Sequence, residues 1–380
     1  MTDRFAAALS QHPVPAHAAG EVLGEVLERV GPAPDRAVLF CTGPLVGALE
    51  DIVRTVRAVL NPRVLIGASA VSVVGGPTEV EESTGLSLWA GRFGVDIDPI
   101  RLDAFRNSDG DLIVAGGGPL QQPGGTLLLL GDPFSFPTEE MLGHFAEVFP
   151  DLTVIGGLAS SGRAPGTNRL ILDDELWSDG AVGVRLPPTV PVSAVVSQGC
   201  RPIGSPVTVT RAERNVLYEL ASRPALERLE EVITALDDDE RRMAATGLHI
   251  GRVIDERRET FMRGDFLIRG VLGADRAAGA VAVGDEIPFG STVQFQVRDA
   301  VSADEDLVAA MTGHDAAGAL LFTCNGRGAR LFGAPDHDAR VVSESLGVSA
   351  VAGMFCAGEI GPVGGRNFLH GFTASIALFG

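Results

Sequence analysis

The sequence contains no lysine, because all 30 basic residues of its 380 are arginines. A Walker-type phosphate loop needs a lysine, and Schiff-base or pyridoxal chemistry needs a side-chain amine as nucleophile. The absence of lysine excludes these chemistries. Acidic residues number 49 and the formal net charge is -19. This charge disfavours nonspecific binding to nucleic acid or anionic lipid, since both require a positive surface.

Cysteine and histidine are also scarce, and their spacing does not indicate a metal site. The four cysteines are widely separated without a CxxC pair, and the seven histidines include no HExxH pattern. No stretch approaches the roughly 18 apolar residues of a membrane helix, and the N-terminal apolar run is too short for a secretory signal. We therefore expect a reduced, cytoplasmic protein that has no metal or cofactor and binds neither nucleic acid nor membrane.

What the sequence does contain is an internal repeat, present at 38–91, 126–186 and 318–380. Each copy reads as a short apolar strand, a helix, a second strand, a glycine-rich turn and a returning apolar strand. The runs VLF, LLLL and ALLF are typical of strands covered on both faces. In the second copy, Thr138 followed by two glutamates reads as a helix N-cap. The strand–helix–strand order predicts parallel pairing, and the returning strand is expected to pair antiparallel.

A proline-rich break at 186–191 divides the chain nearly in half. We expect one domain at 1–190 and another at 191–380, related by pseudo-twofold symmetry. Helical patterns are expected at 213–220 and 224–243, with strand-like segments after them. The predicted fold class is α/β of mixed α+β character, with two related domains of mixed sheets flanked by helices.

Several motifs resemble the FIST family. FTCNGRG (322–328) and MFCAGEIGPVGGRNFLHGFTASIALF (354–379) are similar to the closing half of a FIST domain, and SQGCRPIGSPVTVT (197–210) is similar to the opening of its C-terminal half. The N-terminal blocks resemble the FIST N-terminal half, so the likeness spans 36–380. The loop at 67–76 lacks the acidic residue that usually ends this segment in the family, so the resemblance assigns it no ligand role.

The resemblance implies a FIST N-terminal domain followed by a FIST C-terminal domain. Bacterial FIST modules are thought to bind small ligands, with amino acids proposed, and to signal to partner proteins. It implies no established reaction. Because no F-box, kinase, methyl-acceptor or DNA-binding segment is attached, we expect a stand-alone sensory protein with a signalling partner.

The turn after the strand ALLF is the first candidate ligand site, formed by Cys324, Asn325, Arg327 and Gly328. Ligands in open α/β sheets commonly lie beyond the carboxyl ends of strands, and an arginine offers two parallel donors to a carboxylate. The alternative is that Arg327 is a solvated or ion-paired structural arginine and Asn325 a turn former.

The glycine-rich turn after the next strand is the second candidate, and we expect it to lie beside the first. Glu359 lies there in a stretch otherwise without charge. It either pairs with Arg327 or caps backbone amides as a structural lock, or it receives the ammonium group of an amino-acid-like ligand. The other predicted ligand-binding residues of this region are Cys356, Gly361, Gly364, Asn367 and His370.

Two other functions remain open at this point. Cys356, Glu359 and His370 could form a thiol or acid–base catalytic site, although a buried cysteine mostly behaves as a small apolar residue. The protein could also be a scaffold without a ligand, whose negative charge favours a basic partner. The acidic run at 237–240 reads as a solvated helix end.

Overall fold

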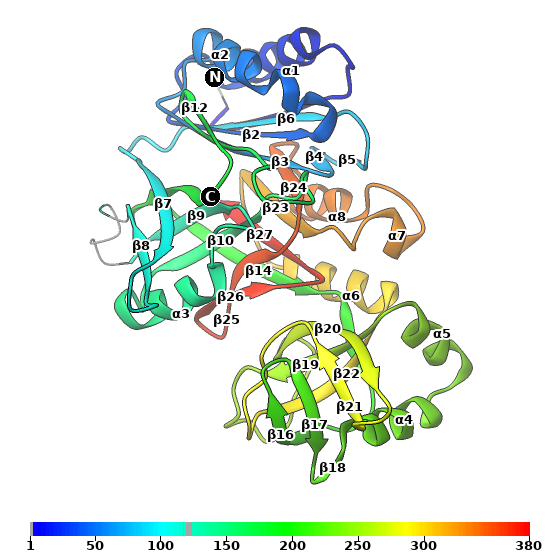
Figure 1. Cartoon of the computed structure of the whole chain (residues 1–380). Coiled ribbons are helices and arrows are strands. Elements are labelled where there is room, and N and C mark those ends of the chain that lie inside the picture. Colours follow the sequence, from blue (N-terminus) through cyan, green and yellow to red (C-terminus); the bar gives the residue numbers. More distant parts are fainter. Residues whose placement is uncertain (1–2, 117, 119–123) are drawn as a thin grey trace. The chain divides into compact units, whose positions relative to one another are not determined.

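The computed structural model describes residues 3–116, 118 and 124–380, which form two compact units (Figure 1). The first unit comprises the chain up to Val196 together with Leu307–Leu369 and Thr373–Gly380. The second comprises Ser197–Asp306 and His370–Phe372. Both combine β-sheet with flanking helices, as the sequence predicts. These units group the chain by its contacts, and the sequence-based division into 1–190 and 191–380 stays a prediction.

The three repeats lie in the first unit, except for residues 370–372 of the third, and each folds as the sequence predicts. Within each repeat the first two strands pair in parallel, and the returning strand pairs antiparallel with the first. The first repeat comprises β2 (Arg36–Thr42), α2 (Leu49–Val59), β3 (Val64–Ala70), β4 (Val73–Gly75), β5 (Thr78–Val80) and β6 (Leu86–Gly91). The second comprises β9 (Thr126–Gly131), α3 (Thr138–Val148), β10 (Thr153–Leu158), β11 (Leu170–Leu172), β12 (Glu175–Trp177) and β13 (Ala181–Leu186). The third comprises β23 (Gly318–Cys324), α7 (Ala329–Phe332), α8 (His337–Leu346), β24 (Val351–Cys356), β25 (Glu359–Val363), β26 (Arg366–His370) and β27 (Thr373–Phe379).

The repeats exchange their glycine-rich turns in a cycle. The turn of each repeat forms a small hairpin that pairs with the second strand of another repeat. The β4–β5 hairpin of the first repeat pairs with β24, the β25–β26 hairpin of the third with β10, and the β11–β12 hairpin of the second with β3. Each repeat therefore completes its sheet with chain from a neighbour, and the three repeats form one interlocked unit.

The second strand of every repeat carries a glycine pressed against its neighbour. Gly67, Gly156 and Gly353 lie in register with leucines on the adjacent first strands. A Cβ added to Gly353 would lie 1.9 Å from the carbonyl oxygen of Leu321, and the equivalent distances at the other two are 2.1 and 1.9 Å. Only a residue without a side chain fits such an approach.

Helices and extra strands cover the outer faces of the sheets. In Figure 1, α1 (Pro15–Val30) and α2 lie on the same side of the sheet that contains β2 and β6, where they bury one continuous apolar cluster. The remaining elements are η1 (Gly43–Ala48), the edge strands β1 (Phe5–Ser10), β8 (Leu112–Ala115) and β14 (Val192–Gln198), strand β7 (Asp98–Arg106) between β13 and β8, and helix α6 (Ala300–Met311). The expected cap at Thr138 is wrong, because Pro137 takes the N-cap position and Thr138 is the first residue of α3.

The second unit is built around antiparallel strands. Its pairings run β22–β16–β17–β21–β20–β19 and return to β22, so six strands close into a ring. Its elements are β15 (Cys200–Pro202), β16 (Val207–Glu213), β17 (Val216–Leu220), β18 (Arg223–Pro224), α4 (Ala225–Ala235), α5 (Asp238–Thr246), β19 (Leu248–Val253), β20 (Phe266–Asp275), β21 (Ala280–Val283) and β22 (Thr292–Arg298). Their apolar side chains form a core separate from those of the first unit.

Two helix predictions in this unit need correction. The segment 213–220 forms the end of β16, a turn with positive φ at Arg214, and strand β17. Pairing with β16 and β21 prevails over the helix-like spacing of its leucines. The segment 224–243 divides into α4 and α5, because Asp237 and Glu240 form a capping box that begins a new helix. The acidic run therefore starts a helix.

Candidate functional site

A pocket of about 650 Å³ lies in the first unit, beyond the ends of the repeat strands. Every repeat contributes loop residues that directly follow its parallel strands, as expected for ligand sites in α/β sheets. Its lining residues are Gly43, Pro44, Val71, Glu82, Ser83, Pro133, Phe134, Ser160, Ser161, Gly162, Arg163, Asn325, Arg330 and Ala357. We call it the strand-end pocket. Residues of all three repeats line the strand-end pocket, so the pocket results from the way in which the repeats pack together.

Ser160 joins the three repeats at the base of this pocket. Its hydroxyl donates to the carbonyl oxygen of Phe355 at 2.6 Å and accepts from the backbone N–H of Val71 at 3.0 Å. These partners belong to the third and first repeats, while Ser160 follows β10 of the second. One hydroxyl therefore ties the loops that follow β3 and β10 to the end of strand β24, which pre-organises the pocket.

A second polar network holds the loop that carries Ser161. Its hydroxyl lies 2.6 Å from the hydroxyl of Ser69, and Asn168 accepts from the backbone N–H of Gly162 at 2.7 Å. The side-chain amide of Asn168 in turn donates to the fully buried Asp132 at 2.9 Å. These hydrogen bonds satisfy the buried side chains of Ser69, Asn168 and Asp132.

The charged side chains of the pocket differ in whether they form an ion pair. Arg330 forms an ion pair with Glu82 at 2.6 Å, and both side chains are largely exposed. Arg163 is also exposed and has no ion pair within the described residues, and the side-chain amide of Asn325 has no hydrogen bond there. The pocket therefore offers one uncommitted guanidinium and one uncommitted amide to an incoming molecule.

Arg327 serves a structural role in this conformation. Its side chain is 1% exposed and donates two hydrogen bonds to Asp338, from Nε at 2.6 Å and Nη2 at 2.8 Å. Thr323 also donates to Asp338 at 2.6 Å. Although burial by itself would raise the pKa of Asp338, the Arg327 guanidinium holds that pKa well below its usual range. Of the interpretations that the sequence left open for Arg327, the ion-paired structural arginine matches the observed geometry.

Glu359 is fully buried at the start of β25. Burial raises the pKa of its carboxyl to about 8, while hydrogen bonds from Thr373 and the nearby Arg327 and Cys324 limit the rise. Thr373 donates from its backbone N–H at 3.1 Å and from its hydroxyl at 2.8 Å. Within the described residues Glu359 has no direct ion pair with Arg327 and accepts from the backbone amide of Thr373, so the amide-capping form of the structural alternative describes its contacts.

The cysteines of the candidate region lie beside Glu359. Cys356 is fully buried, and burial raises the pKa of its thiol well above the ordinary value, with further contributions from Glu359 and Cys324. Cys324 is half-buried and directly precedes Asn325. The two predicted corners therefore meet at residues 324–327 and 356–359. Of the ten predicted ligand residues, Asn325 is the one that lines the strand-end pocket.

The remaining predicted residues lie outside the strand-end pocket, most of them in closely packed positions, although Gly364 is exposed. Gly328 has φ +72° and faces the Glu81 carboxylate, and Gly361 faces the Ser375 hydroxyl, where an added Cβ would come within 2.3 Å. Gly364 has a positive φ between β25 and β26. Asn367 binds the backbone of β10 through both ends of its amide, and His370 is buried within the second unit. Their roles in ligand binding stay predictions.

Sequence reasoning missed most of the pocket's polar residues. Ser160, Ser161 and Arg163 follow β10, the second strand of its repeat, as Ala357 follows β24 in the third repeat. The same rule about strand ends, applied to every copy of the repeat, would have identified them. Val71, in the loop to which the resemblance assigned no ligand role, also lines the pocket.

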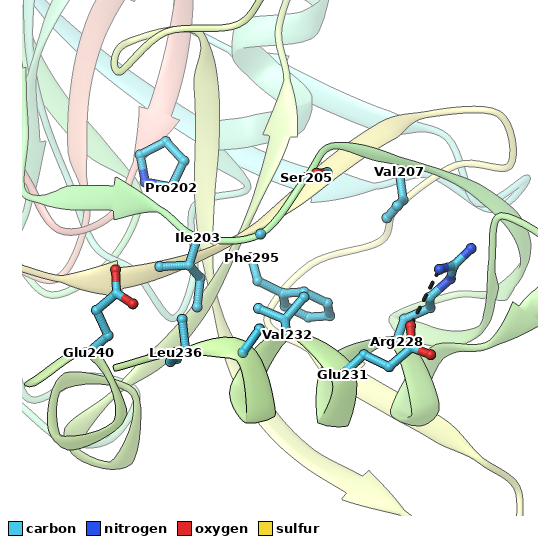
Figure 2. Close-up of a pocket in the computed structure, with 12 residues that line it drawn as sticks. Pro202, Ile203, Ser205, Val207, Arg228, Glu231, Val232, Leu236, Glu240 and Phe295 are labelled. Atoms are coloured by element: carbon cyan, nitrogen blue, oxygen red, sulfur yellow. Dashed lines mark hydrogen bonds and ion pairs between the residues drawn. The ribbon is translucent and has the colours of Figure 1, made fainter. Parts of the chain in front are cut away.

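The second unit has a pocket of its own, of about 460 Å³, between α4 and the segment that links β15 to β16 (Figure 2). Figure 2 shows Ile203, Val232, Leu236 and Phe295 forming its apolar part. The charged pair Arg228 and Glu231 is joined at 3.4 Å. Because these charges already neutralise each other, this pocket offers less to an ionised ligand than the strand-end pocket does.

The described residues contain no group of three or more histidine, cysteine and acidic side chains arranged to hold a metal ion. Within the same residues, no helix combines the length and apolar character needed to cross a membrane.

The fold and site therefore define a mixed α+β protein with a ligand-sized pocket at the strand ends of three interlocked repeats. The FIST N domain matches residues 35–223 and the FIST C domain matches residues 225–362. The chain belongs to the FIST family. FIST domains are generally sensory, ligand-binding domains of signalling proteins.

The chain is also similar to mycobacterial proteins along nearly its whole length. It is 44% identical to the uncharacterized protein Rv0628c of Mycobacterium tuberculosis, over 99% of each chain. It is likewise 44% identical to the uncharacterized protein Mb0898c of Mycobacterium bovis, over 95% of each.

Proposed function

We propose that this protein is a cytoplasmic sensor that binds a small carboxylate, of the amino-acid kind, in the strand-end pocket. The observation that carries the proposal is the exposed Arg163 without an ion pair in a pocket built by all three repeats. A guanidinium presents two parallel N–H donors that match a carboxylate.

The other polar groups of the pocket fit a zwitterion. Asn325 supplies an amide that can donate and accept, as the sequence predicted for it. Glu82 supplies a carboxylate for an ammonium group, although Arg330 now occupies it. An amino acid would exchange this exposed ion pair for its own contacts, which costs little because exposed pairs contribute only about 0–1 kcal/mol.

Signalling would follow from how the pocket is assembled. Its loops come from three repeats that are held together by Ser160 and by the exchanged hairpins. A ligand that contacts several loops would stabilise one arrangement of them, and so change the surface offered to a partner protein.

A thermal-shift screen of the full chain against amino acids and simple carboxylates tests this proposal. A ligand at 100 times its Kd stabilises the folded state by about 2.7 kcal/mol, so the melting temperature should rise. Arg163→Ala should abolish most of that rise. Arg340→Ala is the matched control, because Arg340 is also exposed but does not line the pocket. The proposal fails if no compound raises the melting temperature, or if both variants respond as the parent does.

A further inference from the structure

Cys324 and Cys356 are the last residues of two neighbouring parallel strands. They lie in register, so their side chains project from the same face of the sheet. Neighbouring strands are about 4.8 Å apart, which falls within the roughly 4.4–6.8 Å between Cα atoms that a disulfide spans. Neither cysteine forms a disulfide in this structure. The strand register therefore places two reduced cysteines at bonding range.

The two thiols differ in exposure. Cys324 is half-buried, whereas Cys356 is completely buried and donates to the carbonyl oxygen of Met354 at 3.6 Å. The residues that follow them, Asn325 and Ala357, are both exposed and both line the strand-end pocket. A small reagent that enters the pocket thus reaches the neighbourhood of Cys324 first.

A hydrogen-bond donor and a positive charge lie beside the Cys324 sulfur. The backbone N–H of Gly326 donates to its Sγ at 3.4 Å. The guanidinium of Arg327 interacts electrostatically with Cys324, and the Cys324 side chain is hydrogen-bonded to the carboxyl of Glu359. Hydrogen-bond donors and a nearby arginine stabilise a thiolate, and thiolates are the form of cysteine that reacts with peroxides.

We propose that Cys324 is a peroxide-reactive thiol at the edge of the strand-end pocket and that Cys356 is its resolving partner. This assignment goes beyond the sensory function and does not depend on what the pocket binds. The cross-link would tie the carboxyl ends of β23 and β24, and with them two of the loops that form the pocket.

The chemistry balances with hydrogen peroxide as the oxidant. The Cys324 sulfur attacks one peroxide oxygen and the O–O bond breaks. The thiol proton passes through the hydrogen-bonded Glu359 carboxyl to the leaving hydroxide, which forms water. Cys324 is then a sulfenic acid. The Cys356 sulfur attacks the Cys324 sulfur, the S–O bond breaks, and the hydroxyl leaves as water with the Cys356 proton. Two thiols lose two electrons, and one peroxide gives two waters.

Mass spectrometry of the peroxide-treated native protein tests the assignment. Trypsin cuts after Arg298, Arg327, Arg340 and Arg366, so the two cysteines fall in separate peptides, 299–327 and 341–366. After limited peroxide treatment and alkylation under denaturing conditions, we expect these two peptides joined with the loss of two hydrogens. The peptides that contain Cys41 and Cys200 should remain alkylated.

Two variants separate the steps. Cys356→Ser should leave a Cys324 sulfenic acid that dimedone traps, whereas Cys324→Ser should abolish both the trapping and the cross-link. Cys41→Ser is the matched control, because it removes another buried free cysteine and should leave the cross-link unchanged. The assignment is overturned if the native protein keeps Cys324 alkylatable, or if Cys324 reaches only the sulfinic acid while Cys356 stays a free thiol. Both outcomes are read on the native chain, whether or not each variant folds.

Discussion

At the scale of single residues, burial decides what the charged side chains near the site can do. Arg327 and Asp338 form a buried pair with two hydrogen bonds, so their charges are committed to the fold. Arg163, which the sequence did not single out, remains exposed without a carboxylate partner within the described residues. The two arginines have the same chemistry, and only their surroundings separate a structural residue from a candidate ligand contact.

Glu359 gives a prediction for the dependence of stability on pH. Burial raises the pKa of its carboxyl from 4.5 to about 8, so the folded protein binds more protons than the unfolded chain between those values. Its contribution to the free energy of unfolding therefore falls as the pH rises from about 4.5 to about 8. Glu359→Gln should reduce this slope by up to about 1.4 kcal/mol per pH unit.

Urea unfolding of the parent and the variant at several pH values measures this difference. Glu79 keeps part of the slope in the variant, because burial and the nearby Asp338 also raise its pKa to about 8. Parallel stability curves for parent and variant across this range would contradict the prediction.

At the scale of elements, each repeat depends on the close approach of its parallel strands. Gly353 faces the Leu321 carbonyl so closely that any side chain forces the strands apart. The same arrangement recurs at Gly67 and Gly156 in the other repeats. The glycine thus allows the two parallel strands to pair closely. The pocket loops follow these strands, so their positions depend on that pairing.

Gly353→Ala should lower the free energy of unfolding by about 1–3 kcal/mol, because the added methyl group overpacks the sheet. Gly24→Ala is the control, since Gly24 lies in α1 with no atom within 4 Å of its added Cβ. The control should gain roughly 0.5–1 kcal/mol, as alanine is favoured over glycine within a helix. Chemical denaturation measures both changes, and equal stability of the two variants would refute the argument.

At the scale of the whole molecule, the two compact units have separate apolar cores. Both tryptophans, Trp89 and Trp177, lie in the first unit, and the single tyrosine, Tyr218, lies in the second. Tryptophan fluorescence therefore reports on one unit, whereas far-UV circular dichroism reports on both.

We expect the unfolding of this chain in urea to occur in more than one step. Units with their own cores need not unfold together, so the tryptophan fluorescence transition should differ in midpoint from the circular dichroism transition. Transitions that coincide in midpoint and slope would show instead that the two units unfold as one.

Much of the fold could be read from local pattern. The apolar runs at 38–40, 127–130 and 319–322 predicted the first strands of the repeats, and their order predicted parallel pairing, which the structure confirms. The segment 213–220 shows the limit. Its leucine spacing reads as a helix, yet residues 216–220 form a strand because β16, which directly precedes it in a hairpin, and the distant β21 pair with it on either side.

The sequence by itself determined the family, the three repeats and the turns that follow their strands, because these depend on periodicity and on residues close together in the chain. The tertiary structure alone decided that the hairpins are exchanged between repeats, that Ser160 joins the three repeats, and that Arg327 is committed to Asp338. Those features depend on pairing and burial between segments far apart in sequence, and hydrogen bonding among them leaves no local periodic signal.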